Sequence, residues 1–137
     1  MTIRCYIDGS AKPNPGKGGI GIVFEGKMSY TISEKCLGDK LSNNEVEYLS
    51  FNRALSEILS YGFSSLSNEE ITIYSDSEML VLQLNGEKSV DKGGRYVSEF
   101  LKAKELLKQF PNLKIKHIPR EENREANLLA SQAVKTR

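Results

Sequence analysis

Apolar and polar residues alternate along several short segments of the chain, and a period of two is typical of strands with one buried face. In the first segment Ile3, Cys5 and Ile7 share one face. A turn-rich stretch at 12–19 and a short connection at 25–27 join the first three segments, which favours an antiparallel meander. The pattern predicts five strands, at residues 2–8, 20–24, 28–36, 71–75 and 113–118.

Apolar residues at helical spacing predict four helices in the remaining segments. The first helix begins at Ser42 or Asn43, both good N-cap residues, and ends at Tyr61-Gly62. A short helix covers roughly residues 76–84, a third lies near 95–109, and the last is capped by Asn123. The stripe of the last helix consists of Ala126, Leu129, Ala130 and Ala133.

The element order βββ-α-β-α-α-β-α predicts one α/β domain over residues 1–137. Strands that follow a helix need crossover connections and therefore pair in parallel. The predicted architecture is a five-stranded mixed sheet, an antiparallel meander plus parallel strands, with helices on both faces.

Composition narrows the class of protein. Hydrophobic residues make up 39% and charged residues 27% of the chain, values typical of a soluble globular protein. No membrane span and no signal peptide is expected, and two cysteines without metal-type spacing favour a reduced, cytoplasmic protein. A single histidine argues against a histidine-based triad or a zinc hydrolase. The net charge of +1 gives no sign of a nucleic-acid partner, although the lysines are spread widely enough to permit a local basic patch.

Two of the predicted strands end in aspartate, at Asp8 and Asp76, and Glu47 lies in the first turn of the first helix. Parallel neighbours place such side chains at the same carboxyl edge, where ligands of open α/β sheets bind. Crowded carboxylates stay ionised when divalent cations lie between them, and oxygen ligands suit Mg²⁺ or Mn²⁺. Taken singly, each acid is more often a cap, a turn residue or part of a solvated face. Only the joint pattern is specific.

Four motifs in order resemble the type 1 ribonuclease H family, and together they span almost the whole chain. The motifs are Asp8-Gly9-Ser10 with Asn14-Pro15-Gly16, then Asn43-Asn44-Glu45-Val46-Glu47-Tyr48, then Ser75-Asp76-Ser77, and last the segment from Pro119 to Asn127. The resemblance implies a ribonuclease H-like fold. The segment from Gly86 to Arg95 is short and lacks a tryptophan cluster, so the basic protrusion of some relatives is expected to be absent, as is an N-terminal hybrid-binding domain.

The resemblance also implies hydrolysis of the RNA strand of RNA–DNA hybrids with two Mg²⁺ or Mn²⁺ ions. It places Asp8, Glu47, Asp76 and position 127 as catalytic metal ligands. The expected partner is an RNA–DNA hybrid. The protein is expected to be a monomer and to need no protein partner. The substrate-binding residues implied by the motifs are Gly9, Ser10, Asn14, Ser42, Asn43, Asn44 and Arg120.

The last motif departs from the family pattern because Asn127 replaces the fourth acid. An amide oxygen can touch a metal but brings no charge, so the second ion should bind more weakly. Three explanations remain open: an active natural variant, a weakened paralogue that only binds hybrids, and an engineered inactive form. A DNA resolvase or integrase of the same broad fold is disfavoured, because Asn14, Asn43 and Asn44 suit an RNA strand. A generic α/β domain with chance acids is the remaining alternative.

Overall fold

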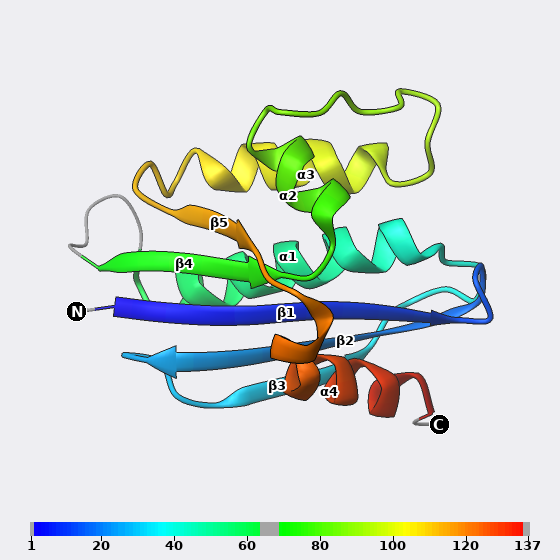
Figure 1. Cartoon of the computed structure of the whole chain (residues 1–137), viewed down its shortest axis with the longest axis horizontal. Coiled ribbons are helices and arrows are strands. Elements are labelled where there is room, and N and C mark those ends of the chain that lie inside the picture. Colours follow the sequence, from blue (N-terminus) through cyan, green and yellow to red (C-terminus); the bar gives the residue numbers. More distant parts are fainter. Residues whose placement is uncertain (1, 64–68, 136–137) are drawn as a thin grey trace.

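The computed structural model describes residues 2–63 and 69–135. Its strands are β1 (Thr2–Lys12), β2 (Lys17–Gly26), β3 (Thr31–Lys35), β4 (Glu70–Ser75) and β5 (Lys114–His117). Its helices are α1 (Asn43–Ser60), α2 (Glu78–Leu84), α3 (Val97–Leu107), the 3₁₀ turn η1 (Arg120–Glu122) and α4 (Arg124–Lys135). The strands form one sheet in the order β3-β2-β1-β4-β5 (Figure 1). β1, β2 and β3 are antiparallel neighbours, whereas β4 runs parallel to β1 and β5, which confirms the predicted mixed sheet.

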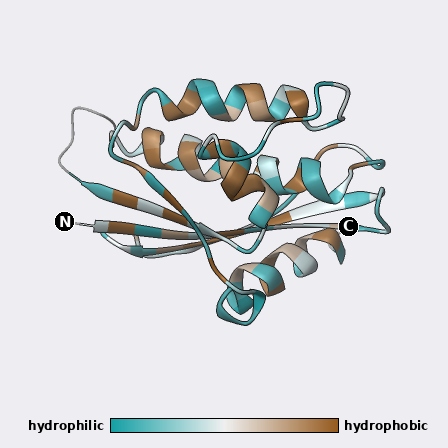
Figure 2. Cartoon of the chain, turned by 45° about the horizontal axis from the view of Figure 1, so that its top comes forward, coloured by the Kyte–Doolittle hydropathy of each residue, from teal (hydrophilic) through white to brown (hydrophobic). Residues whose placement is uncertain are grey.

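The helices cover both faces of the sheet. Gly18 and Gly19 are consecutive on β2, so their Cβ directions are opposite. A Cβ on Gly18 would meet Val46 of α1, whereas one on Gly19 would meet the backbone of Ala130 on α4. Figure 2 shows the sheet between α4 on one side and α1, α2 and α3 on the other.

The main core lies between the sheet and α1. Ile3, Cys5 and Ile7 of β1 are fully buried there, as predicted from their alternation. Tyr48, Phe51, Leu55 and Ile58 of α1 pack into the same core and come from the predicted helical stripe.

The contact between β2 and α4 is built largely from glycine against alanine. A Cβ on Gly21 would lie 2.2 Å from the carbonyl oxygen of Ala126 and 2.6 Å from the amide nitrogen of Ala130. The bare glycine backbone therefore allows α4 to approach the sheet closely. Gly21 is also the direct pairing partner of Asp8, so this close approach occurs beside the predicted site.

β1 is longer than its alternation indicates. The prediction ended at residue 8, but pairing continues from Gly9 with Ile20 to Lys12 with Lys17. Gly9 and Ser10 resemble a turn when read locally, and only their pairing with β2 makes them a strand. Within the described residues, no helix has the length and apolar character needed to cross a membrane.

The segment after α2, where some relatives carry a basic protrusion, is a short loop tied to the helices by polar contacts. The buried Gln83 accepts a hydrogen bond from the Tyr48 hydroxyl (2.7 Å) and lies within hydrogen-bonding distance of the Tyr96 hydroxyl (3.0 Å). The side chain of Gln83 also donates to the carbonyl of Ser89 (3.2 Å). Arg95 forms an ion pair with Glu45, which is part of the capping box at the start of α1. The loop therefore rests against the start of α1.

Candidate active site

The carboxylates meet where β4 ends and β1 continues. The last pair between these strands is Ile7 with Ser75, so the next residues, Asp8 and Asp76, emerge together at an opening in the sheet. The start of α1 lies against this opening, because a Cβ on Gly9 would collide with the backbone of Val46 and Glu47. The absent side chain of Gly9 thus lets Glu47 reach the two aspartates.

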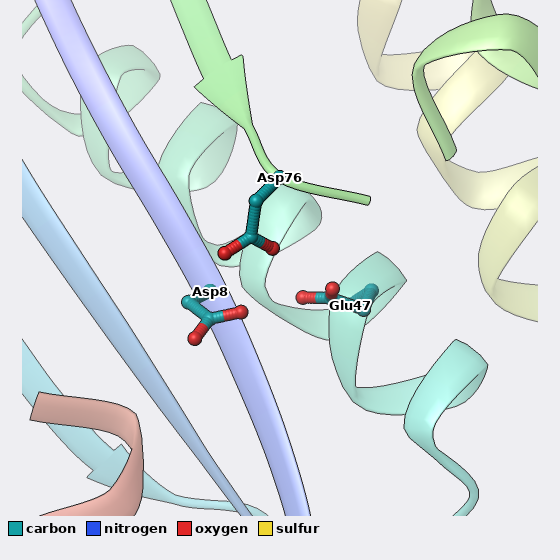
Figure 3. A group of neighbouring side chains, drawn as sticks. All are labelled: Asp8, Glu47 and Asp76. Carbon is teal, nitrogen blue, oxygen red and sulfur yellow. The ribbon is translucent and has the colours of Figure 1, made fainter. Parts of the chain in front are cut away.

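Asp8, Glu47 and Asp76 form a compact cluster, as predicted. One carboxylate oxygen from each residue lies within 4.8 Å of those of the other two. Figure 3 shows the three side chains converging from β1, the end of β4 and α1. The backbone N–H of Gly9 donates to Oε1 of Glu47 (2.8 Å), which fixes the direction of that carboxylate.

The electrostatics of this cluster suit a bound cation. Burial, followed by the charge of Asp76, raises the pKa of Asp8 to about 6. Burial, followed by the charges of Asp8 and Asp76, raises the pKa of Glu47 well above its usual range. Both shifts express the cost of placing negative charges together away from water, and a divalent cation between them removes that cost. The three carboxylates thus fit a hard cation such as Mg²⁺ or Mn²⁺.

Asn127, where the motif resemblance leads one to expect a fourth acid, lies beside the cluster. Its side-chain nitrogen donates to Oδ2 of Asp8 at 2.7 Å, so the amide offers a donor where a carboxylate would offer an acceptor. The start of α4 is held in place by Asn123, which is buried and donates to the carbonyl of Ile7 (2.8 Å). Asn123 was predicted only as a helix cap. Its contact with β1 leaves no local sequence signal.

A cleft of about 300 Å³ opens over the cluster. Of the predicted substrate-binding residues, Gly9, Ser10, Asn43 and Arg120 line it, together with all four predicted metal ligands. Lys12 also lines the cleft and supplies a positive charge at its edge.

The other predicted substrate-binding residues surround the start of α1. Asn14 accepts a hydrogen bond from the backbone N–H of Asn43 (3.0 Å), and Asn43 accepts one from that of Ala11 (3.3 Å). These bonds join the end of β1 and the loop after it to the helix. Ser42 is the N-cap of α1 and accepts from the N–H of Glu45, while Asn44 is exposed in the first turn. The roles of these residues in substrate binding stay predictions.

Comparison with known proteins agrees with the fold and the motifs. The sequence profile of the reverse transcriptase-like family matches residues 6–133. EbsB of Enterococcus faecalis is 32% identical over 133 residues, which cover 96% of this chain and 93% of that protein. Ribonuclease HI of Halobacterium salinarum is 29% identical over 135 residues, and the chain spans only 64% of its length.

The structural comparison leads to the same group. The crystal structure of LC11-RNase H1 in complex with an RNA/DNA hybrid superimposes with a TM-score of 0.86 and 31% identity, covering 97% of this chain and 96% of that one. The chain therefore belongs to the reverse transcriptase-like family, and its fold and ordered motifs are those of the type 1 ribonucleases H.

Proposed function

We propose that this protein hydrolyses the RNA strand of RNA–DNA hybrids with the help of Mg²⁺ or Mn²⁺. The observation that carries the proposal is the cluster of Asp8, Glu47 and Asp76 at the open edge between β1 and β4. The hybrid bound by LC11-RNase H1, which is similar over almost its whole length, supports the choice of substrate.

The residues of the site divide into metal ligands, a group that orients one ligand, and residues that recognise the substrate. Asp8, Glu47 and Asp76 would hold two divalent ions, with position 127 as a further ligand. Bound ions of this kind supply a nucleophilic water and stabilise the attacking and leaving oxygens of an in-line displacement. The N–H of Gly9 keeps Glu47 oriented toward the cluster. Asn14, Asn43 and Asn44 present amide groups that can recognise 2′-hydroxyls across the minor groove, which distinguishes RNA from DNA.

Asn127 favours a second candidate function, a hybrid-binding protein with little or no cleavage. In the structure its amide nitrogen bonds to Asp8, and Asn127 adds no negative charge to the cluster. The ligand set thus carries three negative charges where the family pattern has four. Weaker binding of the second ion would slow cleavage while leaving the recognition of the hybrid intact.

The test is cleavage of an end-labelled RNA–DNA hybrid, in Mg²⁺ and separately in Mn²⁺. The wild-type protein is run beside Asn127→Asp, with single-stranded RNA and duplex DNA as control substrates. Hybrid-specific cleavage by the wild type supports the enzyme. Cleavage by Asn127→Asp alone supports the hybrid-binding function. If neither protein cuts the hybrid, the proposed nuclease activity is wrong.

A further inference from the structure

A second depression adjoins the active-site cleft on the side of α4. Its volume is about 530 Å³, and its lining consists of Arg120, Glu121, Arg124, Asn127 and Leu128. Arg120 and Asn127 line both this depression and the cleft over the carboxylates. A molecule that fills the cleft can therefore continue directly into the depression.

The two arginines of this depression differ from the other arginines in the described ranges. Arg4, Arg53 and Arg95 each form an ion pair with a glutamate. Among residues 2–63 and 69–135, neither Arg120 nor Arg124 is paired with a carboxylate, although acidic residues are their neighbours in the chain. An exposed arginine is ordinarily just solvated. Two unpaired guanidinium groups lining one hollow next to three carboxylates form a more specific arrangement.

The chemistry of the depression fits a phosphodiester. Guanidinium groups bind phosphate oxygens through two parallel hydrogen bonds, and two of them outnumber the single acid in the lining, Glu121. Leu128 is 57% exposed and adds an apolar surface on which a sugar can pack. The carboxylate cluster itself repels phosphate unless cations are bound, so an adjacent positive site offsets that repulsion.

We propose that Arg120 and Arg124 form an anion site that holds a phosphate next to the scissile one on the same RNA strand. Arg124 is the new element, because its sequence position at the start of the last helix gave no indication of substrate contact. The inference rests on the proposed function for the identity of the strand. The site itself would bind the backbone of a hybrid whether or not the strand is cut.

The test measures hybrid affinity rather than cleavage, in an Asp76→Asn background that prevents hydrolysis. Arg124→Gln is compared with Arg4→Gln, which removes a guanidinium group from β1, outside both the cleft and the depression. We expect Arg124→Gln to weaken binding about tenfold and to reduce the slope of log affinity against log salt by about one. Arg4→Gln should change neither quantity, and Arg124→Lys should restore the slope.

A second measurement locates the phosphate. The affinity of Asp76→Asn, the parent protein, and of its Arg124→Gln variant is measured for a set of hybrids. Each hybrid carries one uncharged methylphosphonate, at a different position of the RNA strand. One position, or two adjacent ones, should weaken binding to the parent protein but not to Arg124→Gln. If Arg124→Gln behaves like Arg4→Gln, if no position shows this selective loss, or if the hybrid does not bind at all, the anion site is refuted. If Arg124→Gln loses affinity in this background, while neither the wild type nor Asn127→Asp cuts the hybrid in the cleavage assay, the anion site stands and the nuclease is rejected.

Discussion

At the scale of single residues, the convergence of the three acids could be predicted, whereas the groups that hold them in place could not. Asp8, Glu47 and Asp76 were recognisable because each occupies a definable place, a strand end or a first helical turn. The partner of Glu47 is the backbone N–H of Gly9, and every residue except proline offers such a donor. For the same reason the bond from Asn123 to the carbonyl of Ile7 could not be predicted from side-chain types.

Removing a single carboxylate should separate catalysis from binding. In Asp8→Asn or Asp76→Asn we expect residual cleavage to be abolished, because the remaining charge holds the cations poorly. Binding of the hybrid should survive, since it depends mainly on contacts to the backbone and the minor groove. Gel-shift binding and end-labelled cleavage on the same preparations test this. Full activity in either variant would show that the cluster is not the catalytic metal site.

The raised pKa of Asp8 predicts a specific dependence of stability on pH. The pKa is about 6 in the folded, metal-free protein, against 3.8 for an unperturbed aspartate, so the folded state binds the proton more tightly. The resulting stabilisation is fully present below about pH 4, is lost as pH rises through about 6, and is on the order of 3 kcal/mol.

Urea unfolding of the wild type and Asp8→Asn at several pH values measures this effect. Without metal, Asp8→Asn should become progressively more stable relative to the wild type between about pH 4 and pH 7. Added Mg²⁺ should recover the lost stability of the wild type at the upper end of that range, because only the ionised carboxylates bind it. A difference between the two proteins that does not change with pH would contradict the assigned pKa.

At the scale of elements, periodicity predicted the five strands and the four α-helices of the described residues, because each buries one face against the sheet or a helix. It did not predict the 3₁₀ turn η1. Their ends were less predictable. β1 runs on to Lys12 because its partner strand continues alongside it, which is a property of two segments together. The close docking of α4 was also not apparent, since Gly19 falls in a turn-rich stretch of the sequence and Gly21, inside a predicted strand, has no side chain that would indicate a helix contact.

Adding one methyl group to this contact should displace α4. Gly21→Ala places a Cβ 2.2 Å from the carbonyl oxygen of Ala126, so helix and strand must separate. We expect a loss of about 2–3 kcal/mol in the free energy of unfolding, typical of overpacking, together with loss of activity as Asn127 moves away from Asp8. Gly93→Ala is the matched control, because its Cβ would make only an ordinary contact at 3.6 Å with Asp91. Equal stability of the two variants in urea would argue against the tight β2–α4 contact.

At the scale of the whole molecule, the helices on the two faces of the sheet bury side chains of unequal size. The face toward α1 buries large residues such as Tyr48, Phe51 and Leu55, whereas the buried residues of α4 are Ala126, Ala130 and Ala133. Apolar stabilisation grows with buried area, so α4 contributes less per turn than α1 does. The single domain predicted for residues 1–137 thus has a strong layer and a weaker one.

Native-state hydrogen exchange should show this difference. Amides of α4 should exchange through a local opening whose free energy is lower than that of global unfolding, whereas amides in the middle of α1 should exchange only by global unfolding. Exchange monitored by NMR at increasing urea concentrations distinguishes the two classes. If α4 and α1 exchange with the same free energy, the molecule unfolds as one unit and the weaker layer does not exist.

The division of the site between these layers has a genetic consequence. Asp8, Glu47 and Asp76 come from β1, α1 and the end of β4, elements that form the main core, while Asn127 lies half-buried on α4. A substitution at this position can alter chemistry without disturbing the packing that folding requires. Because asparagine and aspartate codons differ by a single base, one point mutation separates the amide from the acid in either direction. A lineage of such proteins can thus lose or regain its fourth acid in one step.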